Sequence, residues 1–246
     1  MTYLFSKANQ HVLCGAIASK ALLAFDFDGT LAPLVDDPRR ATMRPYTRRL
    51  LRRTCRLYPC VVISGRARAD AQSKLQGLGM RCVIGNHGAE LHHDPAAVRR
   101  RVRRWLPVLR AHIPRDLGVR IENKRLSVAL HYRQARDRHA ARRAVLAAAG
   151  ALKGVRIVGG ALAVNLLMQR APHKGLAVEY ARVRLGCDKV VYIGDDATDE
   201  DAFAQGPPER LLSIRVGRKQ QSAASHYIRD QREIDGLLEA LVAMRA

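Results

Sequence analysis

Short apolar runs recur along the chain, and each ends at a turn-forming or acidic residue. They cover residues 22–25, 60–63, 82–84, 190–193 and 211–216. Runs of this length, bounded in this way, indicate buried strands. Apolar residues at helical spacing between and after them predict helices over 45–57, 68–75, 174–185, 199–205 and 234–244. This alternation predicts a Rossmann-like, doubly wound α/β fold with a mostly parallel sheet, whose functional side chains gather where the strands end.

The stretch from 93 to 168 breaks that alternation. A long helix over 95–112, containing Trp105 and interrupted by Pro107, is followed by strands, a helix and two more strands. These are expected at 119–122, 126–133, 136–149, 155–158 and 162–166. We therefore expect a core built from 1–92 and 169–246, with an inserted α+β cap over 93–168. Such a cap would move on hinges near 91–95 and 168–172.

The charge is unusual for a chain of 246 residues, because 43 Lys and Arg face only 22 Asp and Glu, a net charge of +21. Many of the arginines lie on predicted helices, where apolar residues such as Val98 and Val102 recur between them. This pattern is typical of the solvated face of an amphipathic helix. With four Phe, seven Tyr and one Trp there is no stacking platform, so nucleic acid is not the favoured partner.

The expected location is the cytoplasm. No apolar run approaches the ~20 residues that span a bilayer, and the weakly apolar segment 11–18 lacks the features of a signal peptide. The five cysteines are odd in number and include no C-x-x-C pair, which favours reduced thiols over a disulfide framework.

Two acidic clusters follow predicted strands. Asp26 and Asp28 stand in the sequence DFDGTL, where Gly29 allows a sharp exit from the strand. Two carboxylates this close require a cation or a shared proton. The second cluster, GDDATDE at 194–200, ends in a helix start that Thr198, Asp199 and Glu200 are expected to cap. With Asp26 and Asp28, the residues Asp195 and Asp196 predict an all-oxygen site suited to Mg²⁺.

Two more residues could bind a phosphate near these acids. Ser64 follows a strand and can donate its hydroxyl, and Lys174 begins a predicted helix with a positive charge. Each alone is weak, since such residues commonly serve only as turn and surface residues. Together with the acids they predict a phosphoryl-transfer site.

In this order the segments 26–31, Ser64, Lys174 and 194–199 resemble the four motifs of the haloacid dehalogenase superfamily, over nearly the whole chain. The resemblance implies that Asp26 is the nucleophile and that Asp28 acts as acid and then as base. It implies a Mg²⁺ ion held by Asp26, the main-chain carbonyl of Asp28, and Asp195. Asp196 and Asp199 would lie behind, fixing Lys174 and metal-bound water.

An insert between the serine and lysine motifs resembles the type IIB cap of sugar phosphatases. The phrases GNHGAE at 85–90, ENK at 122–124 and HYRQ at 131–134 are similar to the trehalose-6-phosphate phosphatase family in particular. That resemblance implies a trehalose-phosphate phosphatase of trehalose biosynthesis, acting on a small sugar phosphate, in which Glu122, Lys124 and Arg133 grip the substrate. Further substrate contacts are expected from Arg66, Asn86, His87 and Asn165.

One difference from the family pattern leaves the identity of the sugar open. The family has a Lys and, four residues later, a Glu on the last cap strand, followed by a basic residue and Pro. Here Ala161 and Asn165 stand in the first two places, then Leu167 and Met168. Sucrose phosphate or a glycosyl phosphoglycerate is an alternative substrate, and a mutase would return the phosphoryl group to a sugar. From another class, a basic nucleic-acid-binding protein would predict a damaged site. A monomer or weak oligomer is expected.

Overall fold

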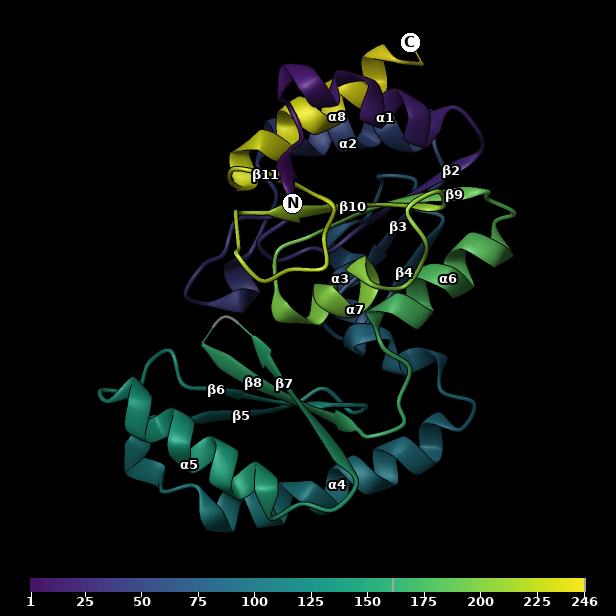
Figure 1. Ribbon diagram of the computed structural model, residues 1–246. Coiled ribbons are helices and arrows are strands. Elements are labelled where there is room, and N and C mark those ends of the chain that lie inside the picture. Colours follow the sequence, from purple (N-terminus) through teal and green to yellow (C-terminus); the bar gives the residue numbers. More distant parts are fainter. Residues whose placement is uncertain (161, 246) are drawn as a thin grey trace.

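A computed structural model describes residues 1–160 and 162–245, which form two stacked units (Figure 1). The upper unit contains a seven-stranded sheet in the order β1-β11-β10-β9-β2-β3-β4, and all of its strand pairs are parallel. Its strands are β1 (Thr2–Tyr3), β2 (Ala21–Phe25), β3 (Cys60–Ile63), β4 (Cys82–Ile84), β9 (Lys189–Gly194), β10 (Leu211–Val216) and β11 (His226–Ile228).

Helices cover both faces of this sheet, as the continuous apolar runs of its central strands require. One face packs against α1 (Gln10–Ile17), α2 (Pro45–Leu57), α3 (Arg68–Lys74) and α8 (Ile234–Ala243). The other face packs against α6 (Lys174–Arg184) and α7 (Glu200–Phe203) (Figure 1). Every residue of β2 is buried, so alternate side chains feed two separate hydrophobic clusters.

The lower unit, the cap, is an antiparallel sheet with helices on one side. Its strands run in the order β5-β6-β8-β7 and are β5 (Arg120–Asn123), β6 (Val128–His131), β8 (Ala163–Met168) and β7 (Val155–Gly160). The outer face packs on α4 (Pro95–His112) and α5 (Arg138–Gly150), which lie far from the core (Figure 1). The inner face turns Asn165 and His131 toward the core and therefore roofs the cleft described below.

The predicted α/β fold with an inserted α+β cap is confirmed, and cap boundaries at 93 and 168 stay a prediction. Three details differ. Helix α4 is continuous through Pro107, because buried Val102 and Leu109 hold the turns on both sides in the cap core. The helix expected over 199–205 is a 3-10 turn (Ala197–Asp199) followed by the short α7. Strands β1 and β11, at one end of the core sheet, were not predicted.

No helix in 1–160 or 162–245 is long and apolar enough to cross a membrane. The carboxyl ends of β2, β3 and β9 all point toward the cap, since these strands are parallel neighbours. The motif residues that follow them are thereby placed at the junction of core and cap.

Candidate active site

A deeply buried positive charge at this junction belongs to Lys174, the first residue of α6. It is 1% exposed, and its Nζ lies 2.9 Å from Oδ1 of Asp26 and 2.7 Å from Oδ1 of Asp199. Burial alone would lower the pKa of Lys174, but the two carboxylates outweigh it and raise that pKa above its usual value. Lys174 is therefore a fixed positive charge beside Asp26, the residue that directly follows β2.

Asp199 is saturated by donors from the protein. Its Oδ1 also accepts from the hydroxyl of Tyr192 at 2.6 Å, and its Oδ2 accepts from the main-chain N–H groups of Asp195 and Asp196 at 3.0 and 2.9 Å. A carboxylate whose two oxygens accept four hydrogen bonds is a poor additional metal ligand. Asp199 thus positions Lys174 and the loop after β9, as expected for a residue behind the reacting groups.

Asp195 faces Asp26 across the turn that follows β2. Gly29 has φ +83°, and a Cβ there would collide with the Asp195 carboxylate, so only glycine lets the two loops approach. The hydroxyl of Thr30 donates to Oδ1 of Asp195 at 3.3 Å. Oxygens of Asp26, Asp195 and Asp199 all lie within 4.8 Å of one another.

This arrangement fits a hard divalent cation. Burial, partly offset by Lys174, raises the pKa of Asp26 to about 7, and burial together with the Asp26 charge raises the pKa of Asp195 to about 9. Two neighbouring carboxylates that share one nearby positive charge, Lys174, are stabilised in their charged form by a bound cation. Since Asp199 is saturated, Asp26 and Asp195 are the side chains that could hold it.

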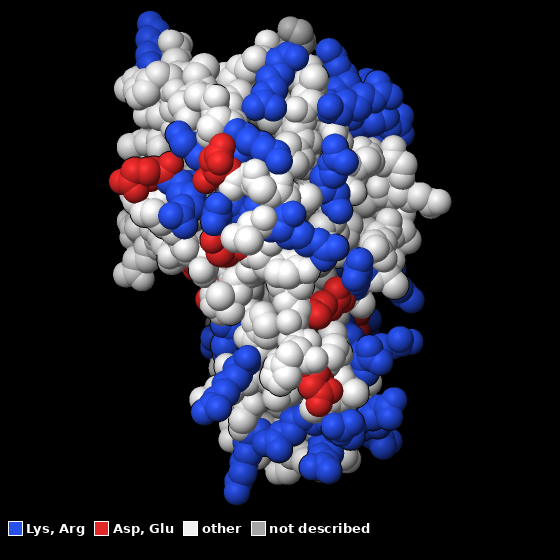
Figure 2. Space-filling view, turned by 90° about the vertical axis from the view of Figure 1, so that its right-hand side faces the viewer, with Lys and Arg blue, Asp and Glu red and all other residues white. Residues whose placement is uncertain are grey.

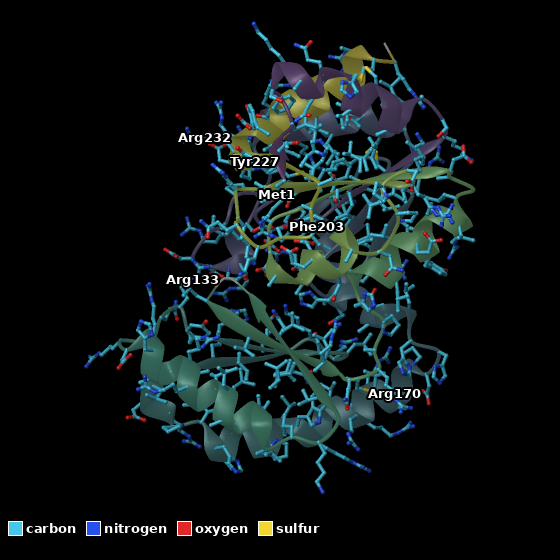
Figure 3. All side chains as sticks on the ribbon, in the orientation of Figure 1. Met1, Arg133, Arg170, Phe203, Tyr227 and Arg232 are labelled. Carbon is cyan, nitrogen blue, oxygen red and sulfur yellow. The ribbon has the colours of Figure 1, made fainter. Side chains whose placement is uncertain are left out.

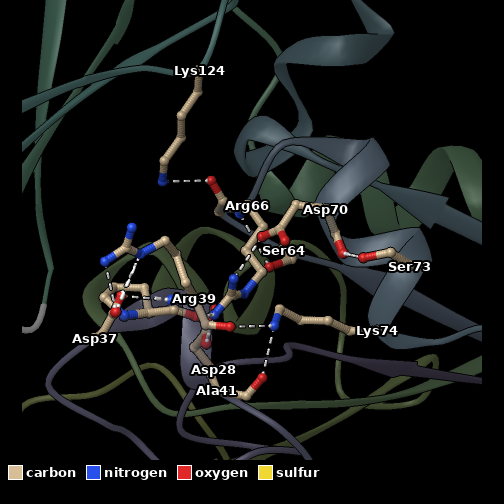
Figure 4. A network of polar contacts seen from close by, with 12 residues as sticks. Asp28, Asp37, Arg39, Ala41, Ser64, Arg66, Asp70, Ser73, Lys74 and Lys124 are labelled. Carbon is tan, nitrogen blue, oxygen red and sulfur yellow. Dashed lines mark hydrogen bonds and ion pairs between the residues drawn. The ribbon is translucent and has the colours of Figure 1, made fainter.

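Arg66 holds the second motif acid. Its Nε and Nη2 donate to the two oxygens of Asp28 at 2.7 and 2.6 Å, and its Nη1 donates to Asp70 at 2.6 Å. Figure 4 shows this guanidinium between Asp28 and Asp70, with Lys124 descending from the cap above it. A bidentate pair of this kind fixes the direction of the Asp28 carboxylate.

A cleft of about 460 Å³ separates these core residues from the inner face of the cap. From the cap, Glu122, Lys124, Arg133 and Asn165 line it, opposite Asp26, Asp28 and Lys174; His87 lines it as well. The His131 ring lies 2.7 Å from Glu122, which lowers the pKa of Glu122 to about 2 despite its burial. Burial holds the pKa of His87 well below its usual value, so this ring is neutral.

Hydrogen bonds and ion pairs join the cap to the core around the cleft. Lys124 Nζ donates to the carbonyl of Gly65 at 3.0 Å, and the Ser127 hydroxyl donates to Oδ1 of Asn86 at 2.9 Å. Ion pairs of 3.3 Å each join Arg133 to Asp36 and Arg156 to Asp201. The structure is therefore a closed arrangement of cap and core.

Not every expected residue reaches the cleft. Within the described chain, Ser64 and Asn86 are buried outside its lining: Ser64 Oγ accepts from the N–H of Arg66 at 3.2 Å, and Asn86 holds Ser127. Asp199 and Glu200 lie in the first turns of this helical segment, as expected for acids at a helix start, but the turn is capped by Asp196, which pairs with Asp199 in a capping box, and not by Thr198. Oδ1 of Asp196 accepts a hydrogen bond from the N–H of Ala197 at 2.8 Å, and Asp196 also lines the cleft. Ala161 lies outside the described residues.

Several residues that line the cleft were not predicted from the sequence. They lie in the loop after the first motif and in or near the first two cap strands: Asp36, Asp37, Arg39, Arg120, His131 and Gln134. The alternation of Arg120, Glu122 and Lys124 along one strand was a usable signal for Arg120. The loop acids carry no such pattern and are identified only by the packing of the cap.

Comparison with known proteins finds relatives of this chain in one family. The sequence profile of the trehalose-phosphatase family matches residues 24–232. A Mycobacterium marinum protein named trehalose-phosphate phosphatase is 34% identical over 217 residues, which cover 82% of this chain and 55% of that protein. The protein of the same name from Mycolicibacterium paratuberculosis is 37% identical over 209 residues, covering 78% and 53%. The chain thus spans about half the length of these curated relatives.

A solved structure agrees with the fold. The C-terminal domain of the trehalose-6-phosphate phosphatase of C. albicans superposes with a TM-score of 0.77 at 20% identity, covering 94% of this chain and 95% of that domain. At this identity the likeness concerns the fold, both core and cap.

Proposed function

This chain belongs to the trehalose-phosphatase family, and we propose that it is a Mg²⁺-dependent phosphatase that hydrolyses trehalose 6-phosphate through an aspartyl-phosphate intermediate. The observation that carries the proposal is the geometry at Asp26. Its carboxylate lies 2.9 Å from Lys174 and within 4.8 Å of the Asp195 carboxylate, at the floor of a cleft that the cap roofs. A carboxylate held between a fixed positive charge and a cation site is arranged to attack phosphorus.

The metal would be held by Asp26, Asp195 and the main-chain carbonyl of Asp28. When bound, Mg²⁺ neutralises charge between the nucleophile and the phosphate. The positive charge of Lys174 also compensates the negative charge of Asp26 and of the phosphate, and Asp199 holds Lys174 in place. Phosphate oxygens would then enter a site already organised for negative charge.

In the first step an Asp26 oxygen attacks phosphorus, and the bond from phosphorus to the sugar oxygen breaks. Asp28 gives its proton to that leaving oxygen. In the second step Asp28 takes a proton from water as the water oxygen attacks phosphorus, and the bond from phosphorus to Asp26 breaks. Phosphate leaves and both carboxyl groups are restored.

Arg66 must part from Asp28 within this cycle. The bidentate pair occupies both oxygens of Asp28, so neither is directed at the leaving oxygen or at water. An incoming phosphate offers Arg66 another partner of the same geometry. We propose that substrate binding frees Asp28 in this way, while Arg66 turns to the phosphate.

The sugar would lie against the cap, where Glu122, Lys124, Arg133 and Asn165 line the cleft. Glu122 can accept from sugar hydroxyls, because the His131 contact keeps it ionised. Asn165 offers an amide where the family has a carboxylate, so it both donates and accepts at one position. Trehalose 6-phosphate is proposed as the substrate because the family is named trehalose-phosphatase and its curated relatives are named trehalose-phosphate phosphatase.

The test is phosphate release with Mg²⁺ from trehalose 6-phosphate, sucrose phosphate and a glycosyl phosphoglycerate, each with the unmodified chain and with Asp26→Asn. We expect the highest kcat/KM on trehalose 6-phosphate and loss of release in the variant. A higher kcat/KM on another substrate would retain the chemistry and refute the proposed sugar. Transfer of the phosphoryl group to an added sugar would favour a mutase. Release that persists in Asp26→Asn would reject the mechanism.

A further inference from the structure

The positive charge of the chain is concentrated in the cap. Residues 93–168 contain 17 Lys and Arg against 4 Asp and Glu, whereas the rest of the chain contains 26 against 18. Figure 2 shows Lys and Arg atoms over both parts of this face, with few Asp and Glu atoms beside them on the lower part, which is the cap. The catalytic cleft uses few of these residues, so most of this charge has no role in the proposed hydrolysis.

A second groove, of about 420 Å³, lies within this basic region. One wall is a stripe of α4 at helical spacing, made of Ala97, Arg100, Arg101 and Arg104. The opposite wall is Gly154 together with residues 168–170, where the chain leaves the last cap strand and returns to the core. The groove shares no lining residue with the catalytic cleft.

One of its arginines is held in place by the backbone. Nη2 of Arg101 donates to the carbonyl of Lys153 at 3.0 Å. Gly154 has φ +68°, and a Cβ at this position would lie 3.2 Å from Nη2 of Arg101. Glycine therefore meets both requirements here, the left-handed backbone and the close approach of the guanidinium.

The other arginines of the groove are poorly compensated. Arg100 reaches Asp94 at 4.0 Å, which is the limit of an ion pair. Among residues 1–160 and 162–245, no hydrogen bond or ion pair of the Arg104 or Arg170 side chain is found. Arg100 and Arg104 are four residues apart on α4, a spacing at which like charges repel. An anion in the groove would relieve this repulsion.

We propose that this groove binds a small anion carrying two or more phosphoryl groups. Guanidinium groups present planar pairs of donors that match phosphate oxygens, and four of them converge here. The volume lies in the range of small-molecule sites, about 300–1,000 Å³. No aromatic side chain lines the groove among the described residues, so stacked nucleic-acid bases have no platform there.

Because of where the groove lies, a bound anion would affect the movement of the cap. Figure 3 shows Arg170 at the segment that leads from the cap back to the core, beside α4. An anion bound by Arg170 and by Arg104 would tie this segment to the helix that begins the cap. This consequence rests on the proposed function, because it acts through cap movement; the binding itself does not.

The test is calorimetric titration with inorganic tripolyphosphate in 0.15 M NaCl, where long-range attraction is screened beyond about 8 Å. The double variant Arg104→Gln/Arg170→Gln is compared with Arg99→Gln/Arg103→Gln, which removes the same charge from exposed positions of α4 outside the groove. We expect one tripolyphosphate site whose affinity falls about tenfold or more in the groove variant and changes less than about twofold in the control.

Equal losses in both double variants would overturn the proposal and leave only a diffuse basic surface. Unchanged binding in the groove variant would place the anion elsewhere, including the catalytic cleft, and would also overturn it. Single-stranded DNA of 12 nucleotides is titrated in parallel. If the DNA binds more tightly than tripolyphosphate and is released by the same groove substitutions, the ligand class is nucleic acid and the proposal is wrong.

Discussion

At the scale of single residues, Asp199 organises the candidate site more than any group expected to react. It accepts from Lys174, Tyr192 and two main-chain N–H groups, and it is fully buried. It thereby joins α6 to the loop after β9. A buried charge with this many partners costs much more to break than a surface pair, because its partners lose their compensation.

We therefore predict that Asp199→Asn lowers the free energy of unfolding by about 3–5 kcal/mol, because Lys174 keeps only Asp26 as a charged partner. The measurement is urea denaturation at pH 7 in the presence of EDTA. Asp116→Asn, an exposed carboxylate on the cap, serves as the control and should change stability by less than about 0.5 kcal/mol. Equal stability of Asp199→Asn and the unmodified chain would contradict the assigned role.

Glu122 supplies a prediction on pH. Contact with His131, partly offset by burial, lowers the pKa of Glu122 to about 2 in the folded chain, from an ordinary value near 4.5. A depressed pKa stabilises the fold above the ordinary value, and that stabilisation disappears as the pH falls through the folded value. In Tm measurements, unmodified chain and Glu122→Gln should differ most above pH 5 and converge toward pH 2. A constant difference would reject this linkage, and Glu209→Gln, an exposed glutamate, should show no such convergence.

At the scale of elements, the apolar pattern predicted the buried parts well. Strands β3, β4 and β10 and helices α2 and α4 have the expected bounds, because their burial imposes a clear period on the sequence. Strands β1 and β11 are only two and three residues long, and of these residues only Ile228 is buried, so burial leaves no pattern in them. The acids that follow β2 and β9, Asp26 and Asp195, were likewise predictable, because each stands directly after an apolar run. Asp36 and His131 line the cleft only because the cap packs on the core, and the sequence pattern carries no sign of this.

Helix α4 allows a test of how packing overrides propensity. Pro107 lies in its interior, where proline lacks the N–H that would bond the Arg103 carbonyl, at a cost of about 3 kcal/mol relative to alanine. Because Pro107 is exposed, Pro107→Ala should restore that bond without disturbing the cap core. We expect the free energy of unfolding to rise by about 1–2 kcal/mol in urea, after the greater entropy of the unfolded variant is counted.

Pro95 is the matched control, since it occupies the first turn of the same helix, where proline is well tolerated. Pro95→Ala should leave stability unchanged or slightly lower. A loss of stability in Pro107→Ala would mean that the backbone of α4 is shaped around the proline.

At the scale of the whole molecule, activity depends on how cap and core meet. Contacts from the turn between β5 and β6 close the cleft, including Lys124 to Gly65 and Ser127 to Asn86. Closure excludes water from the attacked phosphorus, yet substrate has to enter and product has to leave. Hinges near 91–95 and 168–172 stay a prediction, and the basic groove lies against the second of these segments.

A disulfide across the closed contact tests this movement. The Ser127 hydroxyl contacts the Asn86 side chain at 2.9 Å, so Ser127→Cys/Asn86→Cys is the pair chosen for a cross-link between cap and core, and its formation is checked by the loss of two free thiols. We expect the oxidised form to lose nearly all turnover and to regain it on reduction. The oxidised single variant Ser127→Cys, with the five native cysteines present, is the control. Full turnover in the cross-linked form would show that the cap need not open.

The central claim is that Asp26 receives the phosphoryl group of trehalose 6-phosphate. The most direct measurement uses this substrate with a ³²P label, Mg²⁺ and the unmodified chain, quenched with acid within a single turnover, before water attacks the aspartyl phosphate. We expect label on the peptide that contains Asp26, and none in Asp26→Asn. Label on another residue, or hydrolysis by the unmodified chain with no labelled protein at any quench time, would contradict the claim.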